Sequence, residues 1–226
     1  MNSVDPRQLA AEFLGTGFLV LGVVGSGIMA ERLSTDVGLQ LFENAFATAG
    51  ILLALILALG PVSGAHFNPV VTAAERVRGT INNQQALGFI VSQFLGGIAG
   101  VIAANVIFDL AAINISGKDR SGIDLMLSEV IATVGLLLVI YGVVTAGRPV
   151  LAAGTVAGYI GGAYWFTSST SFANPAVTVA RTMSDTFAGI EPSSAVGFIG
   201  AQIVGALIGI PLFLWLFANN SDEPAT

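Results

Sequence analysis

Long apolar segments separated by short polar ones dominate this chain. Six of them are long enough to cross a membrane, because about 20 apolar residues span the hydrocarbon core of a bilayer as a helix. They cover residues 9–30, 39–59, 86–108, 123–146, 150–166 and 196–217. The pattern predicts an all-α membrane protein with six transmembrane helices. We expect the polar residues 219–226 to form a disordered tail.

Two shorter stretches, each with an Asn-Pro pair, interrupt this pattern. Residues 63–70 read SGAHFNPV and residues 171–176 read SFANPA. Asn is a favoured N-cap and Pro a favoured first helical residue, so each pair predicts the start of a helix. The two predicted helices cover residues 71–79 and 177–184.

These helices are too short to span the membrane alone. A helix of about ten residues is roughly 15 Å long, half the thickness of the hydrocarbon core. We therefore predict two re-entrant half-helices whose N-termini meet at the midplane. Capping occupies the side-chain oxygens of Asn68 and Asn174. The NH2 group of each side chain would then remain free to face a pore.

Matching polar residues divide the chain into two repeats. Glu12 in the first apolar segment corresponds to Glu129 in the fourth, and Gln93 in the third corresponds to Gln202 in the sixth. Each half holds three spans, an odd number, so the second half must enter the membrane from the opposite side. The prediction is an inverted repeat, with residues 1–115 as the first copy and 116–218 as the second.

Glycine at four-residue spacing is frequent in the apolar segments. Such glycines let transmembrane helices approach closely, and we expect them to pack against neighbouring helices. They are Gly96, Gly100, Gly154, Gly158, Gly205 and Gly209, whereas Gly162, in the same series, is interpreted separately below.

Composition narrows the possible functions. The chain is 54% hydrophobic and 10% charged, and its net charge of −6 argues against a nucleic-acid partner. It has no Cys and one His, which excludes thiol catalysis and a metal site built from Cys or clustered His. One His and two distant acids assemble no catalytic constellation, so we expect neither an enzyme nor a bound cofactor.

The stretch SGAHFNPVVT at 63–72, together with the second Asn-Pro pair, resembles the aquaporin superfamily, the major intrinsic proteins. The resemblance covers nearly the whole chain. It implies one channel domain over residues 1–226, a homotetramer with one pore per subunit, and small-molecule solutes as ligands. The implied location is the lipid bilayer of a bacterial inner membrane, which the chain would cross several times. Residues 174–190 look like a bacterial subgroup associated with arsenic-resistance operons.

The resemblance also implies roles for individual residues. Asn68 and Asn174 would donate hydrogen bonds to solute at the pore centre, and Glu12 and Glu129 would brace the re-entrant loops. Backbone carbonyls would form a ladder of acceptors along one wall. The residues of this ladder are Gly64, Ala65, His66, Ser171, Phe172 and Ala173.

The implied selectivity filter departs from the family. Counting from the motifs places it at Thr48, Gly162, Ser171 and Val177, and Val177 stands where most members have Arg. A ring without that guanidinium should be wide and weakly polar, and pore diameter and lining donors determine selectivity. We therefore expect passage of glycerol, urea and metalloid acids such as arsenite and methylated arsenicals, and of water. Whether anions pass remains open, and Arg181 is interpreted as an ion pair or anchor of its half-helix.

A secondary transporter is the alternative function. Inverted repeats also occur in transporters, and carboxylates within the membrane are candidates for proton coupling. Glu12 or Glu129 would supply that coupling. A brace explains both residues at once, because they occupy equivalent positions of the two repeats.

Overall fold

The computed structural model of the chain describes residues 4–218, and every regular element in that range is helical. The predicted tail at 219–226 lies outside the described residues. The elements are α1 (Pro6–Leu33), α2 (Val37–Ser63), α3 (Pro69–Arg78), α4 (Asn83–Ile107), α5 (Ile123–Thr145), a 3₁₀ turn (Pro149–Leu151), α6 (Ala152–Phe166), α7 (Pro175–Arg181) and α8 (Pro192–Leu216).

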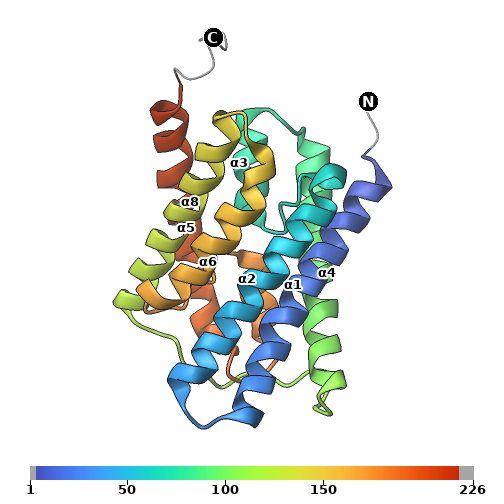
Figure 1. Cartoon of the computed structure of the whole chain (residues 1–226), viewed down its shortest axis with the longest axis vertical. Coiled ribbons are helices and arrows are strands. Elements are labelled where there is room, and N and C mark those ends of the chain that lie inside the picture. Colours follow the sequence, from blue (N-terminus) through green and yellow to red (C-terminus); the bar gives the residue numbers. More distant parts are fainter. Residues whose placement is uncertain (1–3, 219–226) are drawn as a thin grey trace.

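The six predicted spans correspond to α1, α2, α4, α5, α6 and α8, within a few residues at each end. All of these except α6 are long and apolar enough to cross a membrane. The helix α6 has 15 residues and continues directly from the 3₁₀ turn. The helices of the first half, α1, α2 and α4, lie on one side of the molecule, and α5, α6 and α8 lie on the other (Figure 1).

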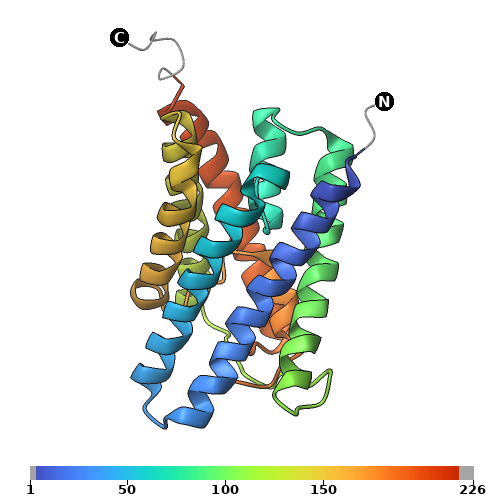
Figure 2. The same ribbon diagram turned by 45° about the vertical axis from the view of Figure 1, so that its right-hand side comes forward.

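The two half-helices enter from opposite ends of this bundle. In Figure 2, α3 lies in the upper half of the molecule and the orange α7 lies in the lower half. Asn68 caps α3 and Asn174 caps α7, each followed by Pro at the first helical position, as predicted. The helix α7 ends three residues before the predicted Ser184. There the amides of Thr182 and Met183 bond to carbonyls three residues back and form a tighter turn.

Glycine allows the closest helix contacts. A Cβ added to Gly96 would lie 2.1 Å from the carbonyl oxygen of Phe13, and one added to Gly100 would lie 2.2 Å from that of Gly17. Both contacts join α4 to α1, so these helices meet backbone to backbone. Gly205 of α8 packs comparably against α5, where an added Cβ would lie 2.8 Å from a Thr133 carbon.

Within the chain, Gly154 and Gly158 of α6 do not make the predicted contact with another helix. Gly154 and Gly158 have no neighbour within 4 Å of an added Cβ, and Gly162 meets only Phe166 of its own helix. All three are exposed in the described part of the chain. They occupy the face of α6 that points away from the bundle.

Candidate functional site

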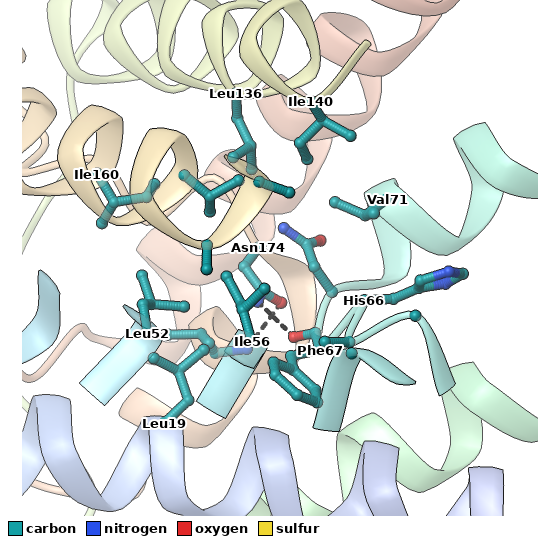
Figure 3. Close-up of a pocket in the computed structure, with 18 of the residues that line it drawn as sticks. Leu19, Leu52, Ile56, His66, Phe67, Val71, Leu136, Ile140, Ile160 and Asn174 are labelled. Atoms are coloured by element: carbon teal, nitrogen blue, oxygen red, sulfur yellow. Dashed lines mark hydrogen bonds between the residues drawn. The ribbon is translucent and has the colours of Figure 1, made fainter. Parts of the chain in front are cut away.

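A central cavity of about 530 Å³ lies between the two halves. Its α3 end is lined by Glu75 and Arg78, and its α7 end by Tyr164 and Arg181. The wall between them is largely apolar. Leu52, Ile56, Leu136 and Ile160 surround a space that Asn174 faces (Figure 3).

The two asparagines meet at the centre of this cavity. The side-chain oxygen of Asn68 accepts a bond of 2.9 Å from the amide of Val70, and that of Asn174 accepts one of 3.0 Å from Ala176. Their NH2 groups are not entirely free, which corrects the sequence-based expectation. Asn68 Nδ2 donates to the carbonyl of Ala173 at 2.7 Å.

The equivalent bond runs from the second loop to the first. Asn174 Nδ2 donates to the carbonyl of Phe67 at 2.8 Å, drawn dashed in Figure 3. Each NH2 group has two hydrogens, so one hydrogen per asparagine remains without a partner among these bonds. The crossed pair fixes the direction of both remaining donors.

The loops that lead to the asparagines have an unusual backbone. Ala65 and Phe67 have φ of 53° and 48°, and Ser171 and Ala173 have φ of 51° and 47°. The left-handed region disfavours residues with a Cβ, at a cost of about 1 kcal/mol or more each. The same alternation in both loops turns the chain so that its amides point to one side.

Buried carboxylates receive those amides. Glu12 accepts bonds from the backbone amides of His66 at 3.0 Å and Phe67 at 2.7 Å. Glu129 accepts bonds from those of Phe172 at 2.9 Å and Ala173 at 2.8 Å. Neither carboxyl group has exposed surface. The hydrogen bonds that they accept from the loop amides offset the strain of the left-handed residues.

Each carboxylate has one further partner on the last span of its repeat. Gln93 Nε2 donates to Glu12 at 2.7 Å and to Thr72 Oγ1 at 2.9 Å. In the second half, Gln202 Nε2 donates to Glu129 at 2.7 Å and to Thr178 Oγ1 at 2.9 Å. The two repeats thus hold their half-helices by the same network.

Five of the six residues predicted for the carbonyl ladder line the cavity: Gly64, Ala65, His66, Ser171 and Phe172. Ala173 does not. It is fully buried, and its carbonyl accepts the bond from Asn68. The carbonyl of Ala173 therefore serves the contact between the loops.

Three of the four residues predicted for the filter line the α7 half of the cavity: Thr48, Ser171 and Val177. Gly162 does not, because it lies on the exposed face of α6. Two residues advance a helix by about 200°, so a residue two positions after Ile160 points away from the cavity that Ile160 lines. The next residue on the lining face is Tyr164.

Tyr164 is a lining residue that the sequence analysis missed. Its hydroxyl lies 3.1 Å from Thr48 Oγ1, a hydrogen bond that joins α6 to α2 across the cavity wall. Val156, Ile160 and Tyr164 are spaced four residues apart and so share one face of α6, but no sequence pattern marked that face as the lining one.

Arg181 also lines the cavity, which the sequence analysis did not expect. Its guanidinium carbon lies 3.3 Å from the centroid of the Phe172 ring, and its Nε donates to the carbonyl of Ala188. Among the described residues it forms no ion pair. Of the two interpretations, ion pair or anchor, the structure therefore agrees with the anchor. Arg181 is in addition one of the residues that line the cavity.

Two more cations surround this end of the molecule. Lys118 Nζ donates to the carbonyl of Phe187 at 2.8 Å, and Arg120 Nε donates to that of Gly189 at 2.9 Å. Burial, followed by the charges of Arg120 and Arg181, lowers the pKa of Lys118 to about 8. Burial also lowers the pKa of Arg120. Three cations, Arg181, Lys118 and Arg120, therefore lie near the α7 end of the cavity, with Glu31 and Asp185 also close to Lys118.

Comparison with known proteins indicates one family. The family model described as "Major intrinsic protein" matches residues 2–167. Aquaglyceroporin AqpS of Rhizobium meliloti (strain 1021) is 44% identical over 210 residues, which are 93% of this chain and 90% of that protein. Aquaporin Z of Photorhabdus laumondii subsp. laumondii is 37% identical over 106 residues, 47% of this chain and 44% of that protein.

A solved structure supports the fold. The X-ray structure of the aquaglyceroporin from Plasmodium falciparum superimposes with a TM-score of 0.68 at 20% identity. The match covers 92% of this chain and 95% of that one. The arrangement of six spans and two half-helices is therefore that of the aquaporin fold.

Proposed function

This chain belongs to the major intrinsic protein family and is a multi-pass membrane channel, and we propose that it conducts small uncharged solutes passively through the central cavity. One observation carries the proposal. The cavity continues past the crossed Asn68–Asn174 pair, where oriented donors face an apolar wall. A hydroxylated solute can bond to the donors while its carbon atoms contact the wall. The relatives are channels and not enzymes, in agreement with the expectation for this chain.

The proposed filter consists of Thr48, Tyr164, Ser171 and Val177. Val177 contributes neither charge nor donor, so the ring is less polar than one with a guanidinium at that position. We infer that it admits glycerol and urea, neutral metalloid acids such as arsenite and methylated arsenicals, and water. Its relative in Rhizobium meliloti is named an aquaglyceroporin, which favours the same solute class.

The charge distribution favours neutral solutes over cations. The N-termini of α3 and α7 face the centre, and helix N-termini carry partial positive charge. The cations near the α7 end add to this potential. A metal ion or ammonium ion would meet repulsion along most of the cavity.

We further propose a homotetramer in the inner membrane of a bacterium. The exposed glycines of α6 give a surface on which a helix of another subunit could pack closely. The proposed tetramer is tested by measuring the mass of the detergent-solubilised protein. A monomeric mass would contradict it.

Liposome swelling tests the transport proposal. Purified protein in liposomes is exposed to gradients of glycerol, urea, arsenous acid and impermeant sucrose, with protein-free liposomes as the control. We expect flux of the first three solutes well above the control and none of sucrose. A pore that passes water alone would contradict the proposed width of the filter.

A further inference from the structure

The guanidinium of Arg181 has hydrogen-bond donors that no other described residue accepts. Its Nε donates to the carbonyl of Ala188, but neither terminal nitrogen has a hydrogen-bond partner among the described residues. The residue is 2% exposed and lines the cavity. The one ion pair in the described chain joins Glu75 to Arg78, so no carboxylate neutralises Arg181. A buried guanidinium without a counter-charge is costly unless a passing group pairs with it.

Helix geometry places this guanidinium near the proposed filter. Val177 and Arg181 are four residues apart on α7 and therefore lie on one face. Side chains on a helix lean towards its N-terminus, so Arg181 reaches back towards the turn that carries Val177. Its stacking on Phe172, in the loop that leads down to Asn174, agrees with this direction.

An unpartnered hydroxyl lies beside this loop. Ser171 Oγ is buried and has no hydrogen-bond partner among the described residues, and Ser171 is one of the residues that line the cavity. Ser171 directly precedes the Phe172 ring on which the guanidinium rests. Tyr164, whose hydroxyl bonds to Thr48, lies close enough to Arg181 for electrostatic interaction. Unpartnered guanidinium donors and an unpartnered hydroxyl therefore belong to residues that line the same end of the cavity.

We propose that Arg181 and Ser171 form an oxyacid subsite at the α7 end of the cavity, through which the channel also passes small singly charged oxyacid anions. The guanidinium fork matches two acceptor oxygens of a planar acid group, and the serine hydroxyl bonds to a further oxygen. This inference rests on the proposed channel function and adds a solute class to it.

The competing explanation is that Arg181 only anchors the loop of residues 187–189. Arg120 provides a matched control, because it bonds to the carbonyls of Phe187 and Gly189 in that loop but does not line the cavity. Replacing each arginine with Met removes a loop contact. Only Arg181→Met also removes donors from the cavity.

The experiment compares lactate with glycerol, a neutral solute of similar size, in liposomes at neutral pH. Wild-type protein should pass both above the protein-free control. Arg181→Met should reduce lactate flux by about tenfold, the effect of losing charge-assisted hydrogen bonds, and glycerol flux by less than about twofold. Arg120→Met should leave the ratio of the two fluxes within about twofold of wild type, since its side chain does not line the cavity.

Each result has a distinct meaning. Glycerol flux without lactate flux in the wild type would overturn this inference and leave the proposed function intact, whereas absence of both would overturn the proposed function. Equal effects of the two Met variants would assign Arg181 to loop anchoring. If Arg181→Met does not fold, Arg181→Lys and Ser171→Ala take its place. An unchanged flux ratio in both would overturn the subsite.

Discussion

At the scale of single residues, the asparagines show how the channel centre is fixed. The oxygen of each side chain caps its own half-helix, and the nitrogen of each bonds to the opposite loop. Two of the three polar functions of each amide are thereby committed to structure. The remaining hydrogen is oriented in advance, which would lower the entropic cost of binding under the proposed role of these residues as donors to solute.

The substitution Val177→Arg tests the proposed filter. Arginine at this position adds a guanidinium to the lining and narrows it, so glycerol flux should fall on the order of tenfold while water flux falls less. Stopped-flow light scattering of liposomes gives both rates. Equal loss for the two solutes would mean that Val177 lies outside the constriction, and Val177→Leu controls for added volume without charge.

Glu129→Gln separates a brace from a proton-coupling site. Glu129 accepts three hydrogen bonds, and a glutamine would direct its NH2 group at another donor. A buried unpaired donor costs about 1–3 kcal/mol, so the midpoint of thermal unfolding should fall. Glu31→Gln, at an exposed carboxylate with one amide partner, is the matched control. Intact stability combined with loss of proton-driven uptake would instead support the transporter.

Lys118 is the single lysine of the chain, which makes its titration measurable. Burial and the nearby arginines disfavour its charged form, so its pKa lies at about 8 and the neutral amine forms at lower pH than in an ordinary lysine. The rate of acetylation at Lys118, followed by peptide mass spectrometry, should therefore level off just above pH 8. A rate that keeps rising to the ordinary lysine value of 10.5 would contradict the described environment.

At the scale of elements, the contact between α1 and α4 depends on the absence of side chains. Gly100→Ala would place a methyl group 2.2 Å from the carbonyl oxygen of Gly17, and such overpacking typically costs about 1–3 kcal/mol. Gly50→Ala on α2 is the control, because nothing lies within 4 Å of its added Cβ. The first variant should unfold at lower temperature and the second should not. Equal midpoints would mean that α4 can shift without cost.

The elements also show what the sequence could predict. Apolar length identified all six spans, and the Asn-Pro pairs identified both half-helices, because these signals are local. The rotation of α6 about its axis was not predictable in this way. Its residues are small or apolar on every face, so no pattern distinguished Gly162 from Tyr164 as the lining residue. The crossed asparagine bonds and the stacking of Arg181 depend on contacts between the two halves, which no local pattern encodes.

At the scale of the whole molecule, the two repeats share a scaffold but differ at their ends. Glu12 with Gln93 and Glu129 with Gln202 repeat one network at matching distances. The α3 end carries a neutralised Glu75–Arg78 pair, whereas the α7 end carries unpaired Arg181. The two ends of the cavity therefore share the same scaffold but differ in charge. A solute that passes through it would meet a neutralised ion pair at one end and an unpaired arginine at the other.

This construction argues for passive flow. Alternating access requires that one half of a transporter move against the other around its site. Here reciprocal bonds between Asn68, Asn174 and the opposite loops join the halves at that point, and both buried carboxylates are already hydrogen-bonded to the loops. Glycerol uptake into liposomes should therefore rise linearly with concentration and be unaffected by a protonophore. Saturation at low glycerol concentration, or collapse of uptake when the proton gradient is removed, would show that the two halves separate during transport.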